Sequence, residues 1–345
     1  MRWEDVYIDA TGVRLGRLED VREAVDEGRY DAEECKTDDF VSVSVVEDAS
    51  YADMAVDAAQ VALSRTHAAH EDFCLVAHAT SFAFQGLDHW ISAPYIQART
   101  VGGRASAVQL EQASNGSMAA MDLAASYVAA RPAPSAALIT TSEKYQLPMF
   151  DRYRSDKNGP KGDGATAMVL TRGSGVARLL ATAVFSDTTH EGVYRGTRPW
   201  TDSWGEYGWP VSMRKRLKEY LSTGVNVQDV AQSIGAGREG AMLQAMDEAG
   251  VGLQDIARFV FPFSGRSMVD WEAAKEKAGL DITDTTWEYG RRLGHLGPGD
   301  QIAGLSHLLE TGAVVPGDKV MLVGVGAGFS FGCAVVEVVA QPQWT

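Results

Sequence analysis

A serine stands just ahead of a strongly apolar helical stretch. Residues 116–130 are rich in Ala and Met, and apolar side chains recur near helical spacing from Met118 to Val128, which predicts a helix buried on most sides. Ser114 precedes this helix, so its hydroxyl would lie near unpaired backbone N–H groups and the positive end of the helix dipole. That position suits a nucleophile. Ser is also a common N-cap residue, and capping of this helix is the alternative interpretation.

Composition limits the classes of protein that this chain can belong to. Its 345 residues are enough for two domains or two fused halves, and its formal net charge of −15 argues against nucleic acid as a partner. It lacks a run of about 18 apolar residues, and its acidic first residues lack an apolar signal core. We therefore expect no membrane span and a cytoplasmic location. Cys35, Cys74 and Cys333 match no metal-binding spacing, so we expect no metal site.

Apolar runs and helical periodicity alternate along the chain. Runs bounded by turns predict buried strands at 6–10, 73–77, 135–141, 166–171, 176–185, 257–261 and 320–325, with a final strand ending at 339. Periodic stretches predict further helices at 47–63, 213–220, 237–249, 271–278 and 302–309. Aromatic-rich irregular segments are expected at 80–104 and 194–209.

The second half of the chain repeats the element order of the first. The matched segments are 73–77 with 257–261, 135–141 with 320–325, and the helix after Ser114 with the helix opened by Asp300. A period of about 170 residues indicates a duplicated α/β domain rather than small repeats. We therefore predict two halves, 1–173 and 174–345. A pseudo-twofold axis between them would bring Ser114 close to the loop 295–300.

Four segments carry a resemblance to a known family. They are ASNGSMAA (113–120), GDGATAMVL (162–170), YGRRLGHLGPGD (289–300) and GVGAGFSFG (324–332). With these segments the chain resembles the ketoacyl synthase III (KAS III) family of thiolase-fold condensing enzymes over nearly its whole length. The resemblance implies a five-layer α/β/α/β/α architecture, with the nucleophile in the first half and a base loop in the second. It also implies a homodimer, and an acyl-CoA or acyl-carrier phosphopantetheine thioester as substrate, with no cofactor.

Three positions depart from the family pattern. Ser114 stands where the family has its nucleophilic Cys, Phe263 stands in place of the His of a PHQAN-like motif, and His295 replaces the family's Asn. KAS III enzymes use that His–Asn pair to stabilise the enolate formed when a malonyl group loses CO₂. Because Phe263 has no donor, at least half of this apparatus is missing.

The residues that remain fit a different mechanism. A Ser hydroxyl needs a base within hydrogen-bond reach, and we expect His295 to be that base, with Asp300 fixing its tautomer. By the resemblance, an oxyanion hole would come from the backbone N–H of Ser114 and from the turn containing Ala327 and Gly328. Two alternatives stay open at this point: Asp300 as the N-cap of its helix, and His295 as a loop residue with no catalytic task.

The pattern resembles serine-bearing KAS III-like proteins of bacterial polyketide and antibiotic pathways. We expect an acyltransferase that takes an acyl group onto Ser114 and passes it to a small-molecule alcohol or amine. The alternatives are a starter-unit ketosynthase that condenses a short acyl group with malonyl-carrier, and a non-catalytic partner of a condensing enzyme. Phe263 and His89 are expected to border the substrate pocket.

Two surfaces are candidates for binding other proteins. Arg214, Lys215, Arg216 and Lys218 form the densest basic cluster of an acidic chain and would dock an acidic carrier protein. An ordinary solvated helix face is the alternative. The apolar strand 135–141 is expected to continue its sheet across the twofold axis of a homodimer.

Overall fold

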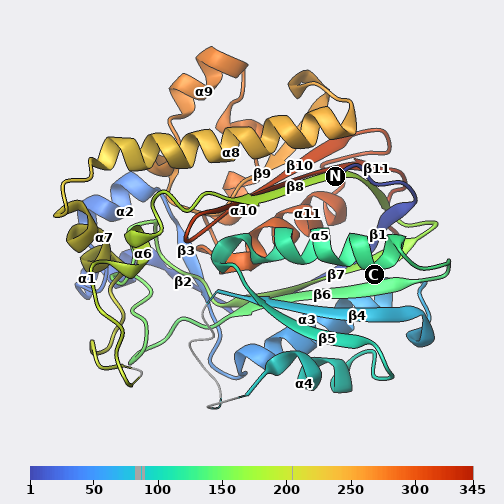
Figure 1. Cartoon of the computed structure of the whole chain (residues 1–345), viewed down its shortest axis with the longest axis horizontal. Coiled ribbons are helices and arrows are strands. Elements are labelled where there is room, and N and C mark those ends of the chain that lie inside the picture. The colour runs from blue at the N-terminus through green and yellow to red at the C-terminus, as the bar shows by residue number, and fades with distance from the viewer. Residues whose placement is uncertain (82–86, 88–89, 204, 345) are drawn as a thin grey trace.

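The computed structural model describes residues 1–81, 87, 90–203 and 205–344, and its main feature is a mixed sheet of nine strands (Figure 1). The strands follow one another across the sheet in the order β5-β4-β6-β7-β1-β8-β11-β10-β9. Their bounds are β1 (Val6–Leu15), β4 (Phe73–Thr80), β5 (Ser106–Glu111), β6 (Ala136–Glu143), β7 (Gly164–Arg172), β8 (Ala177–Ser186), β9 (Ile256–Val260), β10 (Lys319–Gly326) and β11 (Ser330–Val338). A separate ribbon pairs β2 (Arg17–Asp20) with β3 (Ser42–Val45).

The nine-stranded sheet consists of two parts that are related by an internal repeat. Strands β4, β6, β7 and β1 have the same order and directions as β9, β10, β11 and β8: the first two of each set are parallel and the rest antiparallel. The sets meet where β1 pairs with β8 at Tyr7↔Arg178 and Ile8↔Ala177. We call the strands from β5 to β1 the first sheet and those from β8 to β9 the second sheet. The expected division after residue 173 falls in the turn between β7 and β8.

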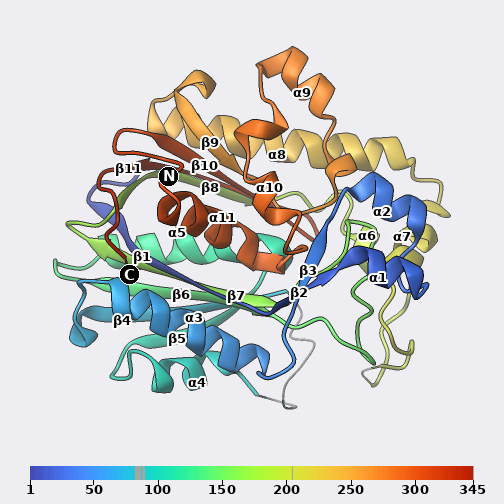
Figure 2. The same cartoon turned by 180° about the vertical axis from the view of Figure 1, so that it is seen from behind.

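Helices separate and cover the two sheets. Helices α5 (Gly116–Ala129) and α11 (Asp300–Glu310) lie between the sheets, where their apolar residues share one core (Figure 1). Helices α3 (Tyr51–Arg65) and α4 (Ser92–Arg99) cover the outer face of the first sheet, and α8 (Val227–Ala249) covers that of the second (Figures 1 and 2). The predicted five-layer α/β/α/β/α architecture is confirmed.

The remaining helices are short, and α1, α2, α6 and α7 gather at one end of the molecule (Figure 1). They are α1 (Val21–Asp26), α2 (Ala32–Asp38), α6 (Gly192–Arg195), α7 (Met213–Leu221), α9 (Trp271–Ala278) and α10 (Trp287–Gly290). The 3-10 turns are η1 (His70–Asp72), η2 (Ala113–Asn115), η3 (Leu253–Asp255), η4 (Arg266–Met268), η5 (Ile282–Asp284) and η6 (Gly297–Gly299). None of the helices in the described ranges is both long enough and apolar enough to cross a bilayer.

The sequence prediction placed the start of helix α8 too late and missed helix α4. Helix α8 begins at Val227, ten residues before the predicted start at 237, after Asn226 caps it by accepting from the Gln228 N–H at 2.9 Å. Its first turns contain Gly235 and several polar residues, which obscure the helical pattern. Helix α4 lies inside the segment expected to be irregular, and it packs against α3 and β5.

The strand proposed for the dimer interface was the wrong one. Strand β6 is hydrogen-bonded to β4 on one side and to β7 on the other, so its backbone has no free edge for a partner. Strand β5 is the outermost strand of the first sheet, and its residues are exposed or half-buried. A sheet edge of this kind is a ready surface for strand pairing between two chains.

We therefore predict a homodimer that pairs the β5 edges of two copies. Sedimentation at micromolar concentration should give a mass of twice the 37.1 kDa chain, because a continuous sheet across a twofold axis satisfies the open backbone groups of both edges. A stable monomer at that concentration would contradict the prediction.

Candidate active site

Ser114 lies in a tight turn that glycine allows to approach the second half of the chain. It is the middle residue of η2, directly after Ala113, whose φ of +47° is in the left-handed region. A Cβ on Gly116 would lie 3.0 Å from the Ala79 Cβ and 3.2 Å from the Pro298 Cβ. A Cβ at position 116 would therefore crowd both neighbours, and its absence lets the Ser114 turn pack closely against the turn η6.

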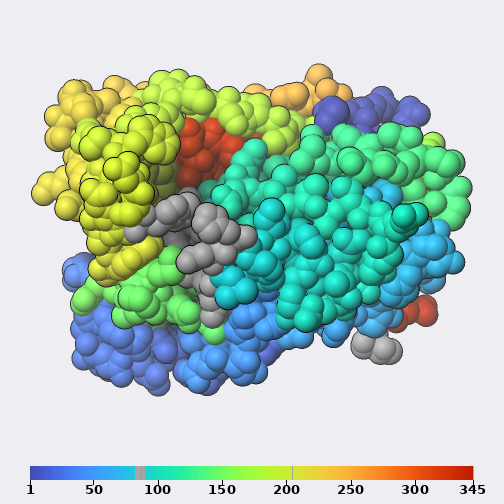
Figure 3. Space-filling model, turned by 60° about the horizontal axis from the view of Figure 1, so that its bottom comes forward, coloured from blue at the N-terminus to red at the C-terminus, as the bar shows by residue number. Residues whose placement is uncertain are grey.

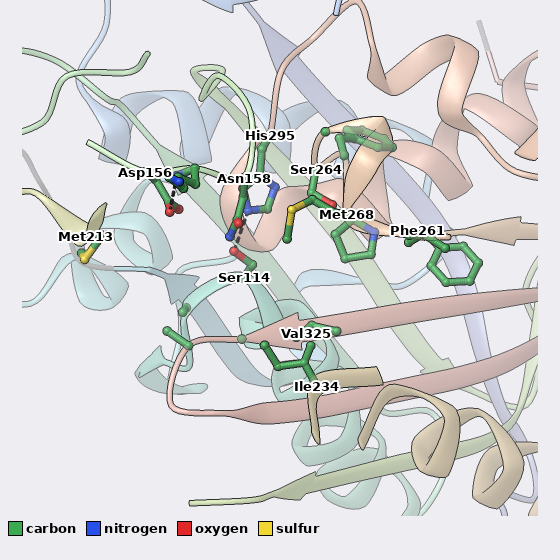
Figure 4. Close-up of a pocket in the computed structure, with 18 of the residues that line it drawn as sticks. Ser114, Asp156, Asn158, Met213, Ile234, Phe261, Ser264, Met268, His295 and Val325 are labelled. Atoms are coloured by element: carbon green, nitrogen blue, oxygen red, sulfur yellow. Dashed lines mark hydrogen bonds between the residues drawn. The ribbon is translucent and has the colours of Figure 1, made fainter. Parts of the chain in front are cut away.

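Ser114, His295 and Asp300 form one hydrogen-bonded chain (Figure 4 shows the first two). The Ser114 Oγ lies 2.7 Å from the His295 Nε2, and the His295 Nδ1 lies 2.6 Å from the Asp300 Oδ2. The Asp300 side chain is fully buried and that of His295 nearly so. Because a carboxylate only accepts, the Nδ1 carries hydrogen and the Nε2 is left to accept from the Ser114 hydroxyl.

The backbone of His295 is held by the segment 160–162. Its N–H donates to the Pro160 carbonyl, and its own carbonyl accepts from the Gly162 N–H, both at 3.0 Å. A Cβ on Gly162 would lie 2.0 Å from the Leu293 carbonyl oxygen. The glycine therefore lets the segment 160–162 run directly beside the His295 backbone and fix its position.

Neither Ser114 nor Asp300 is the N-cap of the helix that follows it. Helix α5 begins at Gly116 after Asn115, and the Ser114 hydroxyl bonds to His295 instead of a helical N–H. Helix α11 begins at Asp300 itself. The Asp300 carboxylate accepts from the backbone N–H of Leu296 at 2.8 Å and of Phe263 at 2.7 Å, in addition to His295. These two bonds fix the carboxylate against the imidazole.

A cavity of about 360 Å³ opens onto Ser114 and His295. Figure 3 shows the surface hollowed beside the yellow segment around residues 190–210, with C-terminal residues in red at its floor. Its apolar lining includes Ile234, Phe261, Met268 and Val325 (Figure 4). None of the three cysteines is among the lining residues, and burial raises the pKa of the Cys333 thiol. Ser114 is therefore the candidate nucleophile of this cavity.

The other predicted site residues are placed as follows. Ala327 lines the cavity with Ser114, whereas Gly328 is not among the lining residues. Phe263 also lines it, but its side chain is only 1 % exposed and packs with Leu293 and Leu296 in a core cluster. His89 lies outside the described residues.

A polar wall of the cavity escaped the sequence prediction. Asp156, Asn158 and Lys161 line the cavity together, and the Lys161 Nζ lies 3.1 Å from the Asp156 Oδ2. Burial alone would raise the pKa of Asp156, but the Lys161 ammonium outweighs it and holds this pKa below its usual value. The segment reads in the sequence only as a polar turn, and nothing in it signals a cavity wall.

Two further buried ionisable groups lie at or next to the cavity. Burial raises the pKa of Glu143 to about 7, although the Ser81 N–H and the Thr80 hydroxyl donate to its carboxylate. Burial also raises the pKa of Tyr145, which lines the cavity. Tyr145 is therefore a neutral phenol at neutral pH and is not a candidate base.

The four basic residues of α7 differ in their contacts: the two arginines are hydrogen-bonded to other parts of the chain, and the two lysines are exposed. Arg214 lines the cavity and donates from Nη2 to the Glu34 carboxylate at 2.7 Å, while Arg216 donates to the Tyr194 carbonyl at 3.0 Å. Lys215 and Lys218 are exposed. Of the four residues in this cluster, Lys215 and Lys218 are the ones free to steer an acidic partner.

We predict that K215E/K218E raises the KM for a carrier-bound donor severalfold at low salt, because exposed charges act mainly on association. The KM for the matching acyl-CoA should change little. Lys277→Glu, a reversal on helix α9, is the control and should affect neither donor. Equal effects on the carrier-bound and CoA donors would favour a solvated helix face.

Comparisons with known proteins agree with this fold and site. The profile of the family described as 3-oxoacyl-[acyl-carrier-protein (ACP)] synthase III C terminal matches residues 246–338. The solved structure of the acyltransferase ChlB3 is 34 % identical to this chain. The match covers 99 % of this chain and 100 % of ChlB3, with a TM-score of 0.88. A search of curated proteins gave no match.

More distant solved structures share the fold. The 3-oxoacyl-(acyl carrier protein) synthase III, FabH, of Pseudomonas aeruginosa PAO1 is 19 % identical, with a TM-score of 0.78 over 98 % of this chain and 99 % of its own. OleA of Xanthomonas campestris is 17 % identical, with a TM-score of 0.74 over the same shares. The architecture is therefore the thiolase fold. Within it, the chain belongs to the KAS III-like family.

Proposed function

We propose that this protein is an acyltransferase that carries its acyl group as an ester on Ser114. The observation that carries the proposal is the hydrogen-bonded chain from Ser114 through His295 to Asp300 at the wall of the cavity. A nucleophile, a base and a group that orients the base are the parts that acyl transfer through serine requires. The donor is an acyl-CoA or an acyl-carrier thioester, and the reaction needs neither metal nor cofactor.

In the first half-reaction the Ser114 Oγ attacks the thioester carbonyl while His295 Nε2 takes the hydroxyl proton. Asp300 stabilises the imidazolium that results, and backbone N–H groups of Ser114 and of the turn at Ala327 and Gly328 are proposed to hold the oxyanion. The carbon–sulfur bond then breaks, and His295 returns its proton to the leaving thiolate. The protein is left with an acyl-Ser114 ester and a neutral His295.

In the second half-reaction the same groups work in reverse. A hydroxyl or amine of the acceptor attacks the ester carbonyl and loses its proton to His295 Nε2. The bond from the carbonyl carbon to the Ser114 Oγ breaks, and His295 returns the proton to that oxygen. Ser114 is regenerated and the acceptor leaves acylated.

Decarboxylative condensation is the second candidate, and the site supports it less well. Its enolate needs a donor where Phe263 stands, and each donor to such an oxyanion is worth roughly 10²–10³ in rate. The Phe263 ring has none, and its backbone N–H is bonded to Asp300. His295 would have to serve both as base for Ser114 and as the remaining enolate donor. Similarity to the acyltransferase ChlB3 also supports group transfer. The third candidate, a non-catalytic partner of a condensing enzyme, fits poorly, because such a protein would not need the base His295 or the carboxylate of Asp300 that orients it.

A competition experiment tests this choice. Protein acylated from an acyl-CoA is offered malonyl-carrier together with a panel of small alcohols and amines, and all products are followed by mass spectrometry. We expect O- or N-acyl products to form at least about tenfold faster than ketoacyl-carrier, since loss of one enolate donor costs more than that. Efficient ketoacyl-carrier formation, without an acylated alcohol or amine, would return the protein to the condensing branch.

A further inference from the structure

The cavity is lined by a buried lysine that the mechanism above does not use. The side chain of Lys161 is 4 % exposed, and its Nζ lies 3.1 Å from the Asp156 Oδ2. Within the described ranges the Lys161 ammonium contacts no second carboxylate. An ammonium has three N–H donors, so part of its donor capacity is left for a ligand in the cavity.

The backbone of Lys161 lies directly beside that of the base. Lys161 and His295 form a parallel β-bridge. Its two hydrogen bonds run from the His295 N–H to the Pro160 carbonyl and from the Gly162 N–H to the His295 carbonyl, both at 3.0 Å. The side chains of Lys161 and His295 both line the cavity. The ammonium therefore lies on the cavity wall next to the imidazole that moves the proton.

The ion pair of Lys161 and Asp156 is not needed to hold its own loop in place. The Lys161 N–H donates to the Arg152 carbonyl at 3.0 Å, and the bridge to His295 is made by backbone groups alone. Taking two charges out of water is costly, and apolar replacements of buried pairs are often neutral or stabilising. A buried pair in this position is better explained by what it does inside the cavity.

Four other cations line the same cavity, and none of them is placed as Lys161 is. They are Lys157, Arg214, Arg238 and Arg266. Lys157 and Arg266 are exposed and mark where the cavity opens to solvent. Arg214 is paired with Glu34, and the Arg238 guanidinium lies over the Phe261 ring, 5.8 Å from its centre.

These cations make the inside of the cavity positive, although the chain as a whole is acidic. Among the described lining residues, Asp156 is the one carboxylate that stands against five Lys and Arg side chains. Preorganised positive groups in a site of this kind stabilise negative charge that develops during a reaction. Lys161 is the buried cation nearest in the backbone to the base, so it is the one placed to act on the reacting atoms.

The ion pair and the proposed oxyanion hole lie on different sides of the nucleophile. Figure 4 shows Asp156 on one side of Ser114 and Val325, two residues before Ala327, on the other. When Ser114 attacks a thioester, the carbonyl carbon becomes tetrahedral, and its oxyanion and its sulfur point in different directions. An oxyanion held near Ala327 leaves the sulfur on the side of Lys161. The segment from Lys157 to Lys161 also runs from the cavity opening to the base, which is the course of an entering thioester arm.

We propose that Lys161 is a catalytic residue that stabilises the leaving sulfur of the thioester donor. The inference rests on the proposed acylation of Ser114 and adds a residue to it. As the carbon–sulfur bond breaks, its electron pair passes to the sulfur, and the Lys161 ammonium donates a hydrogen bond to the thiolate that forms. The proton that neutralises this thiolate comes from His295 Nε2. Lys161 keeps its own proton throughout, and Asp156 holds the ammonium in position.

The dependence of acylation on the leaving group tests this role. S-ethyl thiobutyrate and S-(2,2,2-trifluoroethyl) thiobutyrate are similar in size, but the fluorinated thiolate is a much weaker base and needs less stabilisation. Single-turnover acylation of Ser114, followed by intact mass, gives a rate for each ester. Lys161→Met should slow acylation from the S-ethyl ester at least about tenfold and from the fluorinated ester at most about threefold, since a hydrogen bond to a charged group is strong enough for such a change. Equal slowing of both esters, or no slowing of either, would overturn the proposal.

Two further variants make the result specific. Lys161→Ala is the second variant if Lys161→Met fails to fold, and the same difference between the esters is expected. Lys144→Met is the matched control, because Lys144 is also buried but donates from Nζ to the Ala49 carbonyl at 2.7 Å, outside the cavity lining. Its ratio of the two rates should equal that of the wild type. A ratio shifted as in Lys161→Met would show that the loss of any buried lysine suffices, against the proposal.

The outcomes separate this role from the proposed function. If the wild type forms no acyl-Ser114 from either ester, the proposed reaction fails and the role of Lys161 fails with it. If the wild type acylates and Lys161→Met slows both esters equally, the reaction stands and Lys161 is structural. If acylation depends on Lys161 as expected but the acyl group then passes to malonyl-carrier, the role of Lys161 stands and the proposed acceptor class is wrong.

Discussion

Replacing Ser114 with Ala should abolish the acyl adduct that the wild-type protein forms with a short-chain acyl-CoA. The wild type should gain one acyl mass, because Ser114 is the nucleophile of the cavity and its hydroxyl bonds to His295 Nε2 at 2.7 Å. Loss of a catalytic serine costs about 10⁶ in rate in serine enzymes, so the variant should show no adduct on the same timescale. Intact-mass spectrometry followed by peptide mapping measures both the extent and the position of the adduct.

Two variants make this result specific. Ser117, in the first turn of the following helix α5, donates from its hydroxyl to the Gln301 side chain at 2.9 Å and is buried outside the cavity lining. Ser117→Ala should therefore acylate like the wild type. Ser114→Cys restores the family's usual nucleophile and should also form an adduct, now as a thioester. An adduct in the wild type that maps to Cys35, Cys74 or any other residue would refute the mechanism.

The layered architecture follows from the sequence because its buried strands are continuous apolar runs. Strands β6 and β10 are enclosed on both sides by other strands and on both faces by helices, so nearly every position in them is buried, and each contains one of the predicted apolar runs. The same holds for α5, whose small side chains pack between two sheets. The match between the segments of β4 and β9, and between those of β6 and β10, then indicates the duplication, and the observed strand order agrees with that pairing.

Which strand lies at the edge of a sheet cannot be inferred in the same way. Strand β6 is buried at every position and β5 at none, yet half of the residues in each strand are apolar, and apolar side chains suit both the centre of a sheet and a dimer interface. The choice is made by the order in which strands assemble, which depends on contacts far apart in the chain. The expectation that 135–141 continues the sheet across a dimer failed for this reason.

The nucleophile and its base could be predicted, whereas the polar wall could not. Ser114, His295 and Asp300 lie in motifs with a family counterpart, and glycines at 116 and 162 permit the close approaches that bring them together. Asp156, Asn158 and Lys161 lie in a polar turn whose composition is that of many surface loops. Their burial results from the packing of this turn beside His295, which no local pattern encodes. Tertiary contacts likewise decide which basic residues of α7 are available to a partner. Arg214 and Arg216 are bonded to distant parts of the chain, which their sequence neighbours do not reveal.

Removing the base should give the second-largest loss of activity. His295→Ala should lower the rate of Ser114 acylation by about 10²–10⁴, the usual contribution of a general base. Single-turnover acylation, followed by intact mass, measures this step without interference from acceptor binding. His67→Ala is the matched control, since His67 also contacts an aspartate, Asp9, at 3.4 Å but lies outside the cavity lining.

Asp300→Asn should cost no more than His295→Ala and should act by a different route. The Asp300 carboxylate accepts from three N–H groups, those of His295 Nδ1, Leu296 and Phe263. An amide has a single acceptor oxygen and presents an NH₂ group on its other side, so it favours the imidazole tautomer with hydrogen on Nε2. That tautomer cannot accept the Ser114 proton, and the same exchange in a serine protease triad lowers kcat by about 10⁴. Exogenous imidazole should partly restore acylation of His295→Ala, where a base is missing, and should not restore Asp300→Asn, where a misprotonated His295 still fills the position. Normal acylation by both variants would show that His295 is not the base and that the loop 295–300 is structural.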